Sequence, residues 1–567
     1  MAGVEFLASG PWQAWPLIQA CIKMAFLLLG FKMGMFFFEG YQIRMKFRKM
    51  KEQGIPIAEP HSLVWGHLKM MGAIRTRFPK DAHSHYAQIF MVQHWREFFP
   101  GAAERPPVLY LDMWPFFEPV AFLVDPGMCQ DIVQDRLQPR HPQMKHLVRY
   151  ISGDGNLAAW DRPVHTLWRS RLNPGFSAQN LQSHLPALIE EVETFVDLLK
   201  AKAPADGSWG NVFQLLERST NMTFDIICRV TMNLSTNEQR EGPTELQSSM
   251  RTLVRNHVIF KNLGTLRLRL NPLWQLQAWR CNRTLRRILM PRIQEQIGAG
   301  AREPQAKTQK TVVQLATKEL SNEAATNKDF DRKQYGEDVL NIMKQFLFAG
   351  HDTTATTITW AFYYLSRDPA ALERLRAEHT SVFGPHPSAA AAALAASPAL
   401  KSCASPPVAA SVRRGNPAYF LTSAAEKNSS SPMFYPTDGF AIVTGAAAMH
   451  YDPALFGPRA NEFLPERFLV PEGHELYPVK YAWRPFEHGP MGCIGQELAL
   501  MEMRLTLLLT MRELDVESAW DEWDMLQGRV AGNERPPTIN GDRAYRTTNG
   551  LSYPTDELPV RVRLRKP

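Results

Sequence analysis

Cysteine is scarce in this sequence, with 6 residues among 567 and no C-x-x-C pair. That spacing argues against a disulfide framework and against a structural zinc site, and it favours a reducing environment. Strong net charge is also lacking, because 64 Lys and Arg against 56 Asp and Glu leave only +8. No basic block interleaved with aromatic residues occurs, so a nucleic-acid partner is not predicted. No fixed-period repeat is present either, which argues against solenoids and propellers.

The chain has ample material for a large core, since 45% of its residues are hydrophobic. Its length allows several domains or one large helical enzyme fold. Apolar residues recur at helical spacing in 185–199, 212–234 and 338–365. Short β-like segments are 108–111, 121–124, 439–444 and 560–564. The prediction is a mainly α protein with a minor β region, whose polar stretch 298–333 and Ala-rich stretch 389–396 are surface linkers.

The N-terminus carries one long apolar run, residues 16–38, which is long enough for a helix to cross a hydrocarbon core of about 30 Å. Lys23 and Lys32 lie near its ends, where their side chains reach the interface. A basic cluster follows: Arg44, Lys46, Arg48, Lys49 and Lys51. By the positive-inside rule the rest of the chain faces the cytosol. We expect a membrane anchor at 1–43 and a basic, proline-containing connector at 44–60; the alternative is an amphipathic helix lying on a surface.

A glycine-rich loop surrounds Cys493, directly before the helical stretch 496–514. Backbone N–H groups at a helix start favour the thiolate form of such a cysteine. Gly489, Gly492 and Gly495 permit the close approach of a flat cofactor. Taken alone, Cys493 is better interpreted as a buried structural cysteine in a glycine-rich turn. The pattern F-x-x-G-x-M-x-C-x-G at 486–495, which begins at Phe486, resembles the haem-binding loop of the cytochrome P-450 family, in which the cysteine thiolate is the axial iron ligand.

A second pattern lies inside a helical segment that is apolar nearly all round. Ala349-Gly350-x-Asp352-Thr353-Thr354 resembles the oxygen-activation motif of the same family. The resemblance implies that Ala349 and Gly350 leave room for dioxygen. It further implies that Thr354 is the hydroxyl next to the bound oxygen and that Asp352 is its acidic proton relay.

The resemblance also implies partners for the haem propionates. In this family a basic residue usually stands where the chain has Met491, so one partner is missing. Arg169, in a segment similar to the family's Trp-x-x-x-Arg pattern but with His165 in place of Trp, is the expected second partner. Arg413 or Arg414 is the expected third.

The stretch 463–468, FLPERF, is similar to the family's PERF element, whose arginine normally bonds the Glu and Arg of an E-x-x-R helix. No E-x-x-R precedes Pro406 and Pro407, where the family places it. The string at 373–376 spells the pattern about one helix too early, and we interpret it as surface charge. The missing segment is either a deletion or an error in the predicted coding sequence.

The resemblance extends from the anchor to the C-terminal strands and is closest in style to fungal microsomal members. It implies a haem-thiolate monooxygenase domain over 61–567, with a low-complexity insert at about 385–405. The implied cofactor is haem b and the co-substrate is O2. The implied reaction inserts one oxygen atom into a lipophilic small molecule at the endoplasmic reticulum membrane. No G-x-G-x-x-G lies in a strand–turn–helix context, so electrons are expected from a separate NADPH-dependent flavoprotein reductase.

Two other functions stay open on sequence. One is a haem-deficient pseudoenzyme, or a truncated gene product, of the same fold. The other is an enzyme that uses Cys493 as a nucleophile and His488 as a base. The substrate is not indicated, because the aromatic residues Trp114, Phe116 and Phe117 and the segment 257–270 fit either a substrate channel or core packing.

Overall fold

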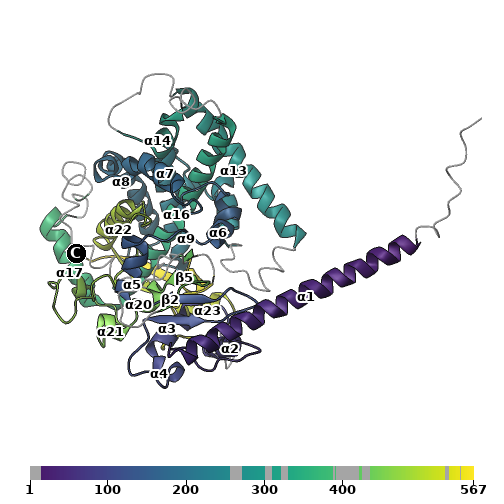
Figure 1. Ribbon diagram of the computed structural model, residues 1–567. Helices are drawn as coiled ribbons and strands as arrows, with labels where there is room; N and C mark the ends of the chain where they lie inside the picture. The colour runs from purple at the N-terminus through teal and green to yellow at the C-terminus, as the bar shows by residue number, and fades with distance from the viewer. Residues whose placement is uncertain are drawn as a thin grey trace, which may run out of the picture.

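The computed structural model describes residues 15–255, 271–299, 309–320, 330–386, 390, 421–423, 435–529, 536–548 and 551–566. Helices dominate these residues (Figure 1). The first half contains α1 (Trp15–Glu52), α2 (Leu68–Arg75), α3 (His85–Gln93), α4 (Trp95–Phe98), α5 (Pro126–Gln130), η2 (Asp131–Asp135), α6 (Gln143–Ser152), α7 (Val164–Leu172), η3 (Asn173–Phe176), α8 (Ala178–Lys200), α9 (Leu215–Met232), α10 (Glu238–Glu241) and α11 (Glu245–Arg255). The second half contains α13 (Pro272–Ala299), α14 (Val312–Lys318), α16 (Arg332–Arg367), α17 (Pro369–Phe383), α20 (Ala446–Met449), α21 (Pro453–Phe456), η5 (Pro465–Phe468), α22 (Gln496–Met511), α23 (Trp520–Leu526) and η6 (Thr555–Glu557).

Two small sheets accompany the helices. The first has the order β1-β2-β5-β4 and is formed by Val108–Leu111, Val120–Leu123, Ala441–Thr444 and Leu421–Ser423. Only its β2–β5 pair is parallel, with Val120 opposite Ala441. The second, of order β3-β7-β6, joins Phe213–Gln214, Pro559–Leu564 and Leu514–Ser518 in antiparallel register. The predicted class, mainly α with a minor β region, is confirmed, and each predicted strand overlaps an observed one.

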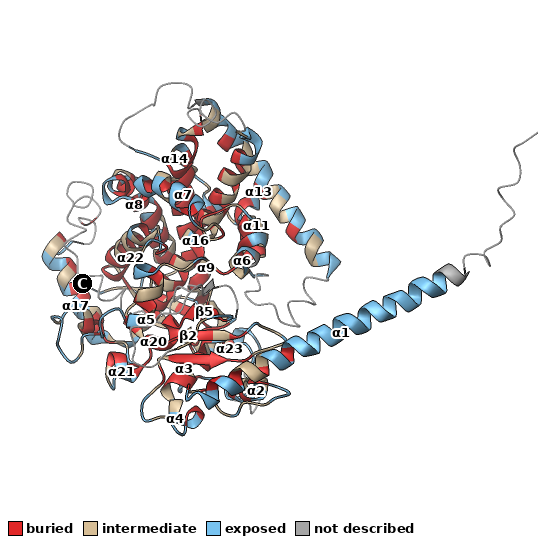
Figure 2. Ribbon diagram, viewed as in Figure 1, coloured by how far each residue is buried: buried red, intermediate tan, exposed pale blue. Residues whose placement is uncertain are grey.

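The helix α16 forms the axis of the body and runs through its centre (Figure 1). It begins where the Asp331 carboxylate accepts hydrogen bonds from the N–H groups of Lys333 and Gln334, at 2.8 and 3.1 Å. Its middle is buried on most sides, and its most extensive contact is with α9 (Figure 2). The prediction of a helix over 338–365 is therefore confirmed. Apolar residues lie on nearly all its sides because it is at the centre of the core.

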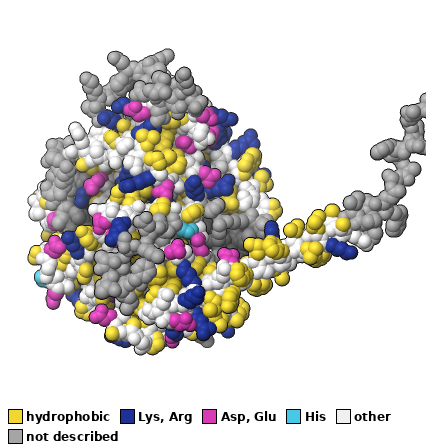
Figure 3. Space-filling view, viewed as in Figure 1, with side chains coloured by type: hydrophobic (Ala, Val, Ile, Leu, Met, Phe, Trp, Pro, Cys, Tyr) yellow, Lys and Arg dark blue, Asp and Glu magenta, His cyan; other side chains and the backbone are white. Residues whose placement is uncertain are grey.

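The helix α1 leaves the body as a long projection whose exposed part is rich in hydrophobic side chains (Figures 2 and 3). Residues 18–39 are exposed throughout, whereas from Gly40 onward some residues of each turn are buried. These 22 residues span about 33 Å as a helix, close to the thickness of a hydrocarbon core. By length and composition α1 is a candidate membrane anchor. The helix also continues to Glu52, through most of the stretch expected to be a connector.

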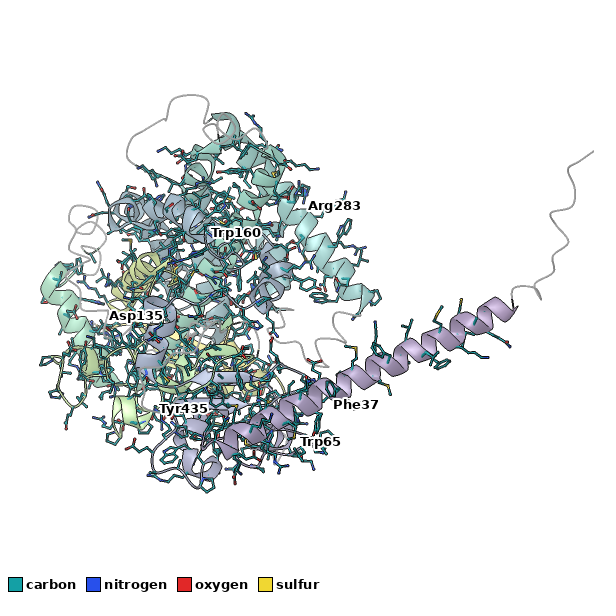
Figure 4. The ribbon with its side chains drawn as sticks, viewed as in Figure 1. Phe37, Trp65, Asp135, Trp160, Arg283 and Tyr435 are labelled. Carbon is teal, nitrogen blue, oxygen red and sulfur yellow. The ribbon has the colours of Figure 1, made fainter. Side chains whose placement is uncertain are left out.

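The C-terminal part of α1 is held to the body by a buried ion pair. Arg44 and Asp112 are 2% and 0% exposed, and the Asp112 carboxylate also bonds His61 Nε2 at 2.9 Å. Trp114 packs across Gly40, where a Cβ would lie 2.6 Å from its ring, and its ring centroid is 4.4 Å from that of Phe36. Phe37 and Trp65 mark this junction in Figure 4. Trp114 therefore serves the attachment of α1, which the sequence did not indicate.

Several predictions lie outside the described residues. They concern Arg413 and Arg414, most of the insert at about 385–405, the segment before Pro406, and the stretch 257–270.

Candidate active site

The loop around Cys493 closes on itself before α22 begins. Cys493 N–H donates to the Phe486 carbonyl at 2.9 Å, and Gly492 N–H donates to the Gly489 carbonyl at 3.0 Å. The Gly495 carbonyl then accepts the N–H of Ala499, at 3.0 Å, in the first turn of α22. Cys493 consequently lies two residues before Gly495, the residue that caps the helix.

The glycines of this loop have different roles. Gly489 has φ +76°, and a Cβ there would lie 2.4 Å from the Val133 carbonyl oxygen. It is required by the backbone conformation and by contact with η2. At Gly495, by contrast, φ is −89° and no atom lies within 4 Å of a Cβ position. Gly495 therefore leaves an open face beside Cys493.

A buried ion pair fixes the start of the loop. The Arg484 guanidinium and the Glu487 carboxylate are 0% and 4% exposed. Glu487 also accepts the Thr444 hydroxyl at 3.0 Å and the His488 N–H at 3.1 Å. Both oxygens of the carboxylate thus accept hydrogen bonds, and the loop is tied to β5.

The thiol of Cys493 is accessible and yet surrounded by protein. Cys493 is an exposed residue, whereas Met491 and Gly492 before it are buried. Burial raises the pKa of Cys493, and the Gly495 N–H and the charge of Arg169 act in the opposite direction. A group that is both accessible and desolvated faces an enclosed space rather than bulk water. A bound cation at the sulfur would reverse the pKa shift, as metal coordination does.

Arg169 links this loop to α7. Its guanidinium donates to the carbonyl of Gly492, and burial lowers its pKa while Cys493 raises it. Arg169, predicted as a propionate partner, therefore does contact the cysteine loop.

One face of α16 is accessible at the centre of the molecule. Ala349 is exposed and Thr353 and Thr357 are half-buried, one turn apart. The Thr353 hydroxyl donates to the Ala349 carbonyl at 2.7 Å. Thr354 is only 4% exposed, because it is rotated by about 100° toward the core. The hydroxyl on the accessible face is therefore that of Thr353, and the choice of Thr354 does not fit the helix geometry.

Gly350 and Asp352 face packed protein rather than the accessible side. A Cβ at Gly350 would lie 2.5 Å from the Ile227 side chain, so this glycine permits the close contact of α16 with α9. Of the two residues predicted to leave room for dioxygen, Ala349 alone lies on the accessible face. Asp352 is fully buried and accepts a hydrogen bond from the Tyr553 hydroxyl. Burial raises the pKa of Asp352 to about 6, against the lowering effect of that hydrogen bond.

The PERF segment is held by backbone carbonyl groups and not by the E-x-x-R side chains that were expected. Arg467 is fully buried and donates to three backbone carbonyl groups, those of Phe456, Arg459 and Leu476. The interpretation of 373–376 as surface charge holds for Glu373 and Arg374, which are 60% and 55% exposed, and is wrong for Arg376. Arg376 is 6% exposed and bonds the Met511 carbonyl at 2.8 Å and the Asp515 carboxylate at 2.7 Å. Its neighbour Arg374 bonds Glu466 of the PERF segment. The helix α17 therefore ties α22, β6 and η5 together.

Three residues at this site were missed by sequence reasoning. Thr353 could have been chosen from its spacing of four residues from Ala349. Tyr553 is 201 residues from Asp352 in sequence, and no local pattern marks it. Arg140 approaches the cysteine loop from the segment between η2 and α6, and no motif marks it either.

The residues present fit an iron porphyrin. The donor set offers one accessible thiolate ligand, an open face at Gly495 and the guanidinium of Arg169 beside the loop. A cysteine thiolate is an axial ligand that haem iron accepts. Among the described residues, no group of three or more His, Cys, Asp or Glu side chains is arranged to hold a metal ion without a porphyrin.

Comparison with known proteins agrees with this chemistry. The family model described as Cytochrome P450 matches residues 107–539. The chain is 31% identical to cytochrome P450 monooxygenase polC of Polytolypa hystricis, over 95% of this chain and 94% of that protein. It is 25% identical to cytochrome P450 monooxygenase acrF of Aspergillus aculeatus, over 86% and 99%, and 26% identical to cytochrome P450 monooxygenase ptmG of Penicillium ochrochloron, over 92% and 91%. The fold and site define a haem-thiolate class of protein. This chain belongs to the cytochrome P-450 family.

Proposed function

We propose that this protein is a monooxygenase that inserts one oxygen atom of O2 into a lipophilic small molecule, with Cys493 as the ligand of haem iron. The observation that carries the proposal is the thiol itself. It is accessible, it lies in a loop made rigid by Gly489 and the Arg484–Glu487 pair, and Arg169 contacts the same loop. The names of the fungal relatives support the reaction class.

When bound, haem b supplies the oxygen chemistry, since thiolate ligation promotes cleavage of the O–O bond. The protein's own residues orient the bound molecules and supply protons. The Thr353 hydroxyl, held by the Ala349 carbonyl, is positioned to pass a proton on the accessible face of α16. Asp352 can take up and release a proton near pH 6, because burial raises its pKa to about 6. The Gly495 face admits the flat ring, and Arg169 and Arg413 are the proposed partners of its propionates.

Electrons come from an NADPH-dependent flavoprotein reductase in this proposal. In this proposal α1 anchors the protein in the endoplasmic reticulum membrane, which its length and composition support. The basic residues that follow the span, including Arg48 and Lys49, favour a cytosolic body. The membrane also concentrates apolar substrates near the site.

The two alternatives make different demands on the loop. A Cys493 nucleophile needs a lowered thiol pKa and an efficient base. Burial raises the thiol pKa instead, and burial together with Arg484 lowers the pKa of His488, whose ring bonds the Trp483 carbonyl at 3.1 Å. A haem-deficient pseudoenzyme is favoured by Met491 and by the missing E-x-x-R before Pro406.

The deciding experiment is the difference spectrum of the reduced, CO-treated full-length protein, expressed with haem supplied. We expect the red-shifted Soret band of thiolate-ligated iron, and its loss in Cys493→Ser. Cys281→Ser is the matched control, since Cys281 lies half-buried on α13 and is expected to keep the band. A folded wild-type protein with no haem band would favour the pseudoenzyme. A band that persists in Cys493→Ser would overturn the assignment of the ligand.

A further inference from the structure

A cavity lies between α3 and the chain segments 451–461 and 536–548. Its volume is about 240 Å³. A cavity of about 150 Å³ with apolar walls holds benzene, so this larger one has room for a fused two-ring molecule. None of the described residues that line it belongs to α16 or to the cysteine loop. The cavity is therefore separate from the candidate active site.

The walls of the cavity are largely aromatic. The ring of Phe78 stacks on that of Tyr86, with centroids 5.6 Å apart, and meets the ring of Phe90 edge-on at 6.1 Å. Tyr451 adds a further ring, and Gln93 of α3 donates to its carbonyl at 2.9 Å. That bond holds α3 against the segment after α20. Rings fixed in this way offer faces and edges to a planar aromatic ligand.

Arg77 lines the same cavity and has little competition for its charge. Its Cζ lies 4.6 Å from the centroid of Phe90. Its carboxylate partner is Glu97, at 3.6 Å, and Glu97 also lies 3.4 Å from His94. Both side chains of the Arg77–Glu97 pair are about half exposed, and such a pair contributes little free energy. The guanidinium can therefore bind the acidic group of a ligand.

A second arginine lies against two of the lining rings. Arg546 is 0% exposed, and its Cζ lies 5.1 Å from the ring centroid of Tyr86 and 5.6 Å from that of Tyr451. Its Nη1 meets His85 Nδ1 at 3.4 Å, while its Nε and Nη2 are buried without a hydrogen-bond partner. Within the part of the chain that the structure describes, Arg546 has no carboxylate partner. A buried cation without a counter-charge is costly.

The histidines around Arg546 yield to its charge. Burial, together with the charges of Arg546 and Arg75, lowers the pKa of His83 to about 3. Burial also lowers the pKa of His85, and His83 and Arg546 act in the same direction. Both rings are therefore neutral at physiological pH, and the positive charge belongs to the arginines. A positive potential beside an apolar cavity favours an anionic ligand over a neutral one of the same shape.

We propose that this cavity binds an aromatic carboxylate, whose planar body packs on the rings of Phe78, Tyr86 and Phe90 and whose carboxylate bonds Arg77. The buried charge of Arg546, beside Tyr86, adds to the preference for a negative group. The inference does not depend on the reaction proposed for Cys493, because the two sites share no residue.

The test measures equilibrium dialysis of naphthoate and of its neutral analogue naphthamide against the full-length protein in detergent, with detergent alone as the blank. We expect wild type to bind naphthoate more tightly. Arg77→Ala should lose roughly tenfold of naphthoate affinity, the value of a charged hydrogen bond, and little affinity for naphthamide. Arg96→Ala is the matched control, because Arg96 is an exposed arginine of α4 whose guanidinium lies over Trp95, at 4.4 Å, and not in the cavity. It should bind both compounds as wild type does.

Two further variants test the cavity and the buried charge. Ile89→Trp fills the cavity with a larger side chain and should abolish binding of both compounds. Arg546→Met removes the buried charge and should reduce the preference for naphthoate. Circular dichroism checks that each variant is folded. A folded wild type that binds neither compound, or both equally, would overturn the inference. So would wild-type affinity for naphthoate in folded Arg77→Ala or in folded Ile89→Trp.

Discussion

At the scale of single residues, the burial of each side chain on α16 decides what it can do. Ala349, Thr353 and Thr357 share the accessible face, while Asp352 and Thr354 are directed into protein. A threonine pair such as 353–354 offers two chemically identical hydroxyls, and only the rotation of the helix distinguishes them.

Replacing each threonine of this pair tests that distinction. We expect Thr353→Ala to lower product formation by roughly 10²-fold, because a positioned proton donor contributes at least that much. NADPH consumption should continue, with reduced oxygen released as hydrogen peroxide. Thr354→Ala should keep the wild-type ratio of peroxide to NADPH. The ratio is measured with reductase and a lipophilic substrate found by its binding spectrum; the opposite ranking of the two variants would restore Thr354 to the role.

The buried carboxyl of Asp352 predicts a pH dependence of stability. Its pKa rises from 3.8 to about 6 on folding, so the folded protein holds the proton more tightly than the unfolded chain. This contribution to the free energy of unfolding is complete below about pH 4 and is lost as the pH rises through 6. The loss is about 3 kcal/mol.

Denaturant unfolding at pH 4 to 7 measures this loss. Asp352→Asn should not show it, so the difference between variant and wild type should grow with pH. In Tyr553→Phe the hydrogen bond that lowers the pKa is gone, and the loss should move to higher pH. Parallel curves for wild type and Asp352→Asn across this range would contradict the assignment.

At the scale of elements, the cysteine loop combines positions that serve the backbone with positions that serve the ligand. Gly489 is occupied on its Cβ side by the Val133 carbonyl, and Gly495 is open there. In the sequence these two positions look alike, because both are glycines and Cys493 lies between them.

Substituting alanine at these two glycines separates the roles. Gly489→Ala requires a positive φ and a contact at 2.4 Å, so the haem-free protein should lose more than about 1 kcal/mol of stability. Gly495→Ala should cost the haem-free protein less, about 0.5–1 kcal/mol, because glycine is preferred to alanine at an N-cap. Its haem content should nevertheless fall, because the methyl group enters the face proposed for the porphyrin. Thermal unfolding of the haem-free forms and the ratio of haem to protein are the measurements; full haem content in Gly495→Ala would place the porphyrin elsewhere.

At the scale of the whole molecule, α1 is both a candidate membrane span and a fixed part of the body. Its exposed part ends at residue 39, and the buried Arg44–Asp112 pair begins about one turn later. The body is therefore attached to the span without a flexible joint. Such an attachment restricts how the site can be oriented toward the membrane surface.

Truncation and substitution distinguish the two parts of α1. Removing residues 1–35, which leaves the contact between Phe36 and Trp114 in place, should release the protein from membranes in a flotation assay and leave the stability of the body unchanged. Arg44→Ala in the full chain should stay on membranes but lose roughly 3–5 kcal/mol, because Asp112 is left buried without its charge partner. A truncated protein that still floats with membranes would show that other surfaces bind lipid.

The family and the fold class follow from local sequence, since the loop at 486–495 and the pattern at 349–354 are short strings whose chemistry depends on adjacent residues. Helix periodicity places α8, α9 and α16 for the same reason, because apolar spacing is a local property. The predictions differ from the structure where helix rotation or long-range contacts matter. Thr354, the predicted hydroxyl, is buried whereas Thr353 is half-buried, and Arg376 was assigned to the surface although it joins α17 to β6.

By itself, the sequence determined the candidate ligand cysteine, the candidate anchor and the acid–hydroxyl pattern, because each is encoded in residues within a few turns of one another. Only the tertiary structure decided which threonine is accessible, that Tyr553 holds Asp352, and that Arg140 lies on Met491. These contacts join segments up to 351 residues apart. Chain packing brings such segments together, and no pattern in either segment alone records the other.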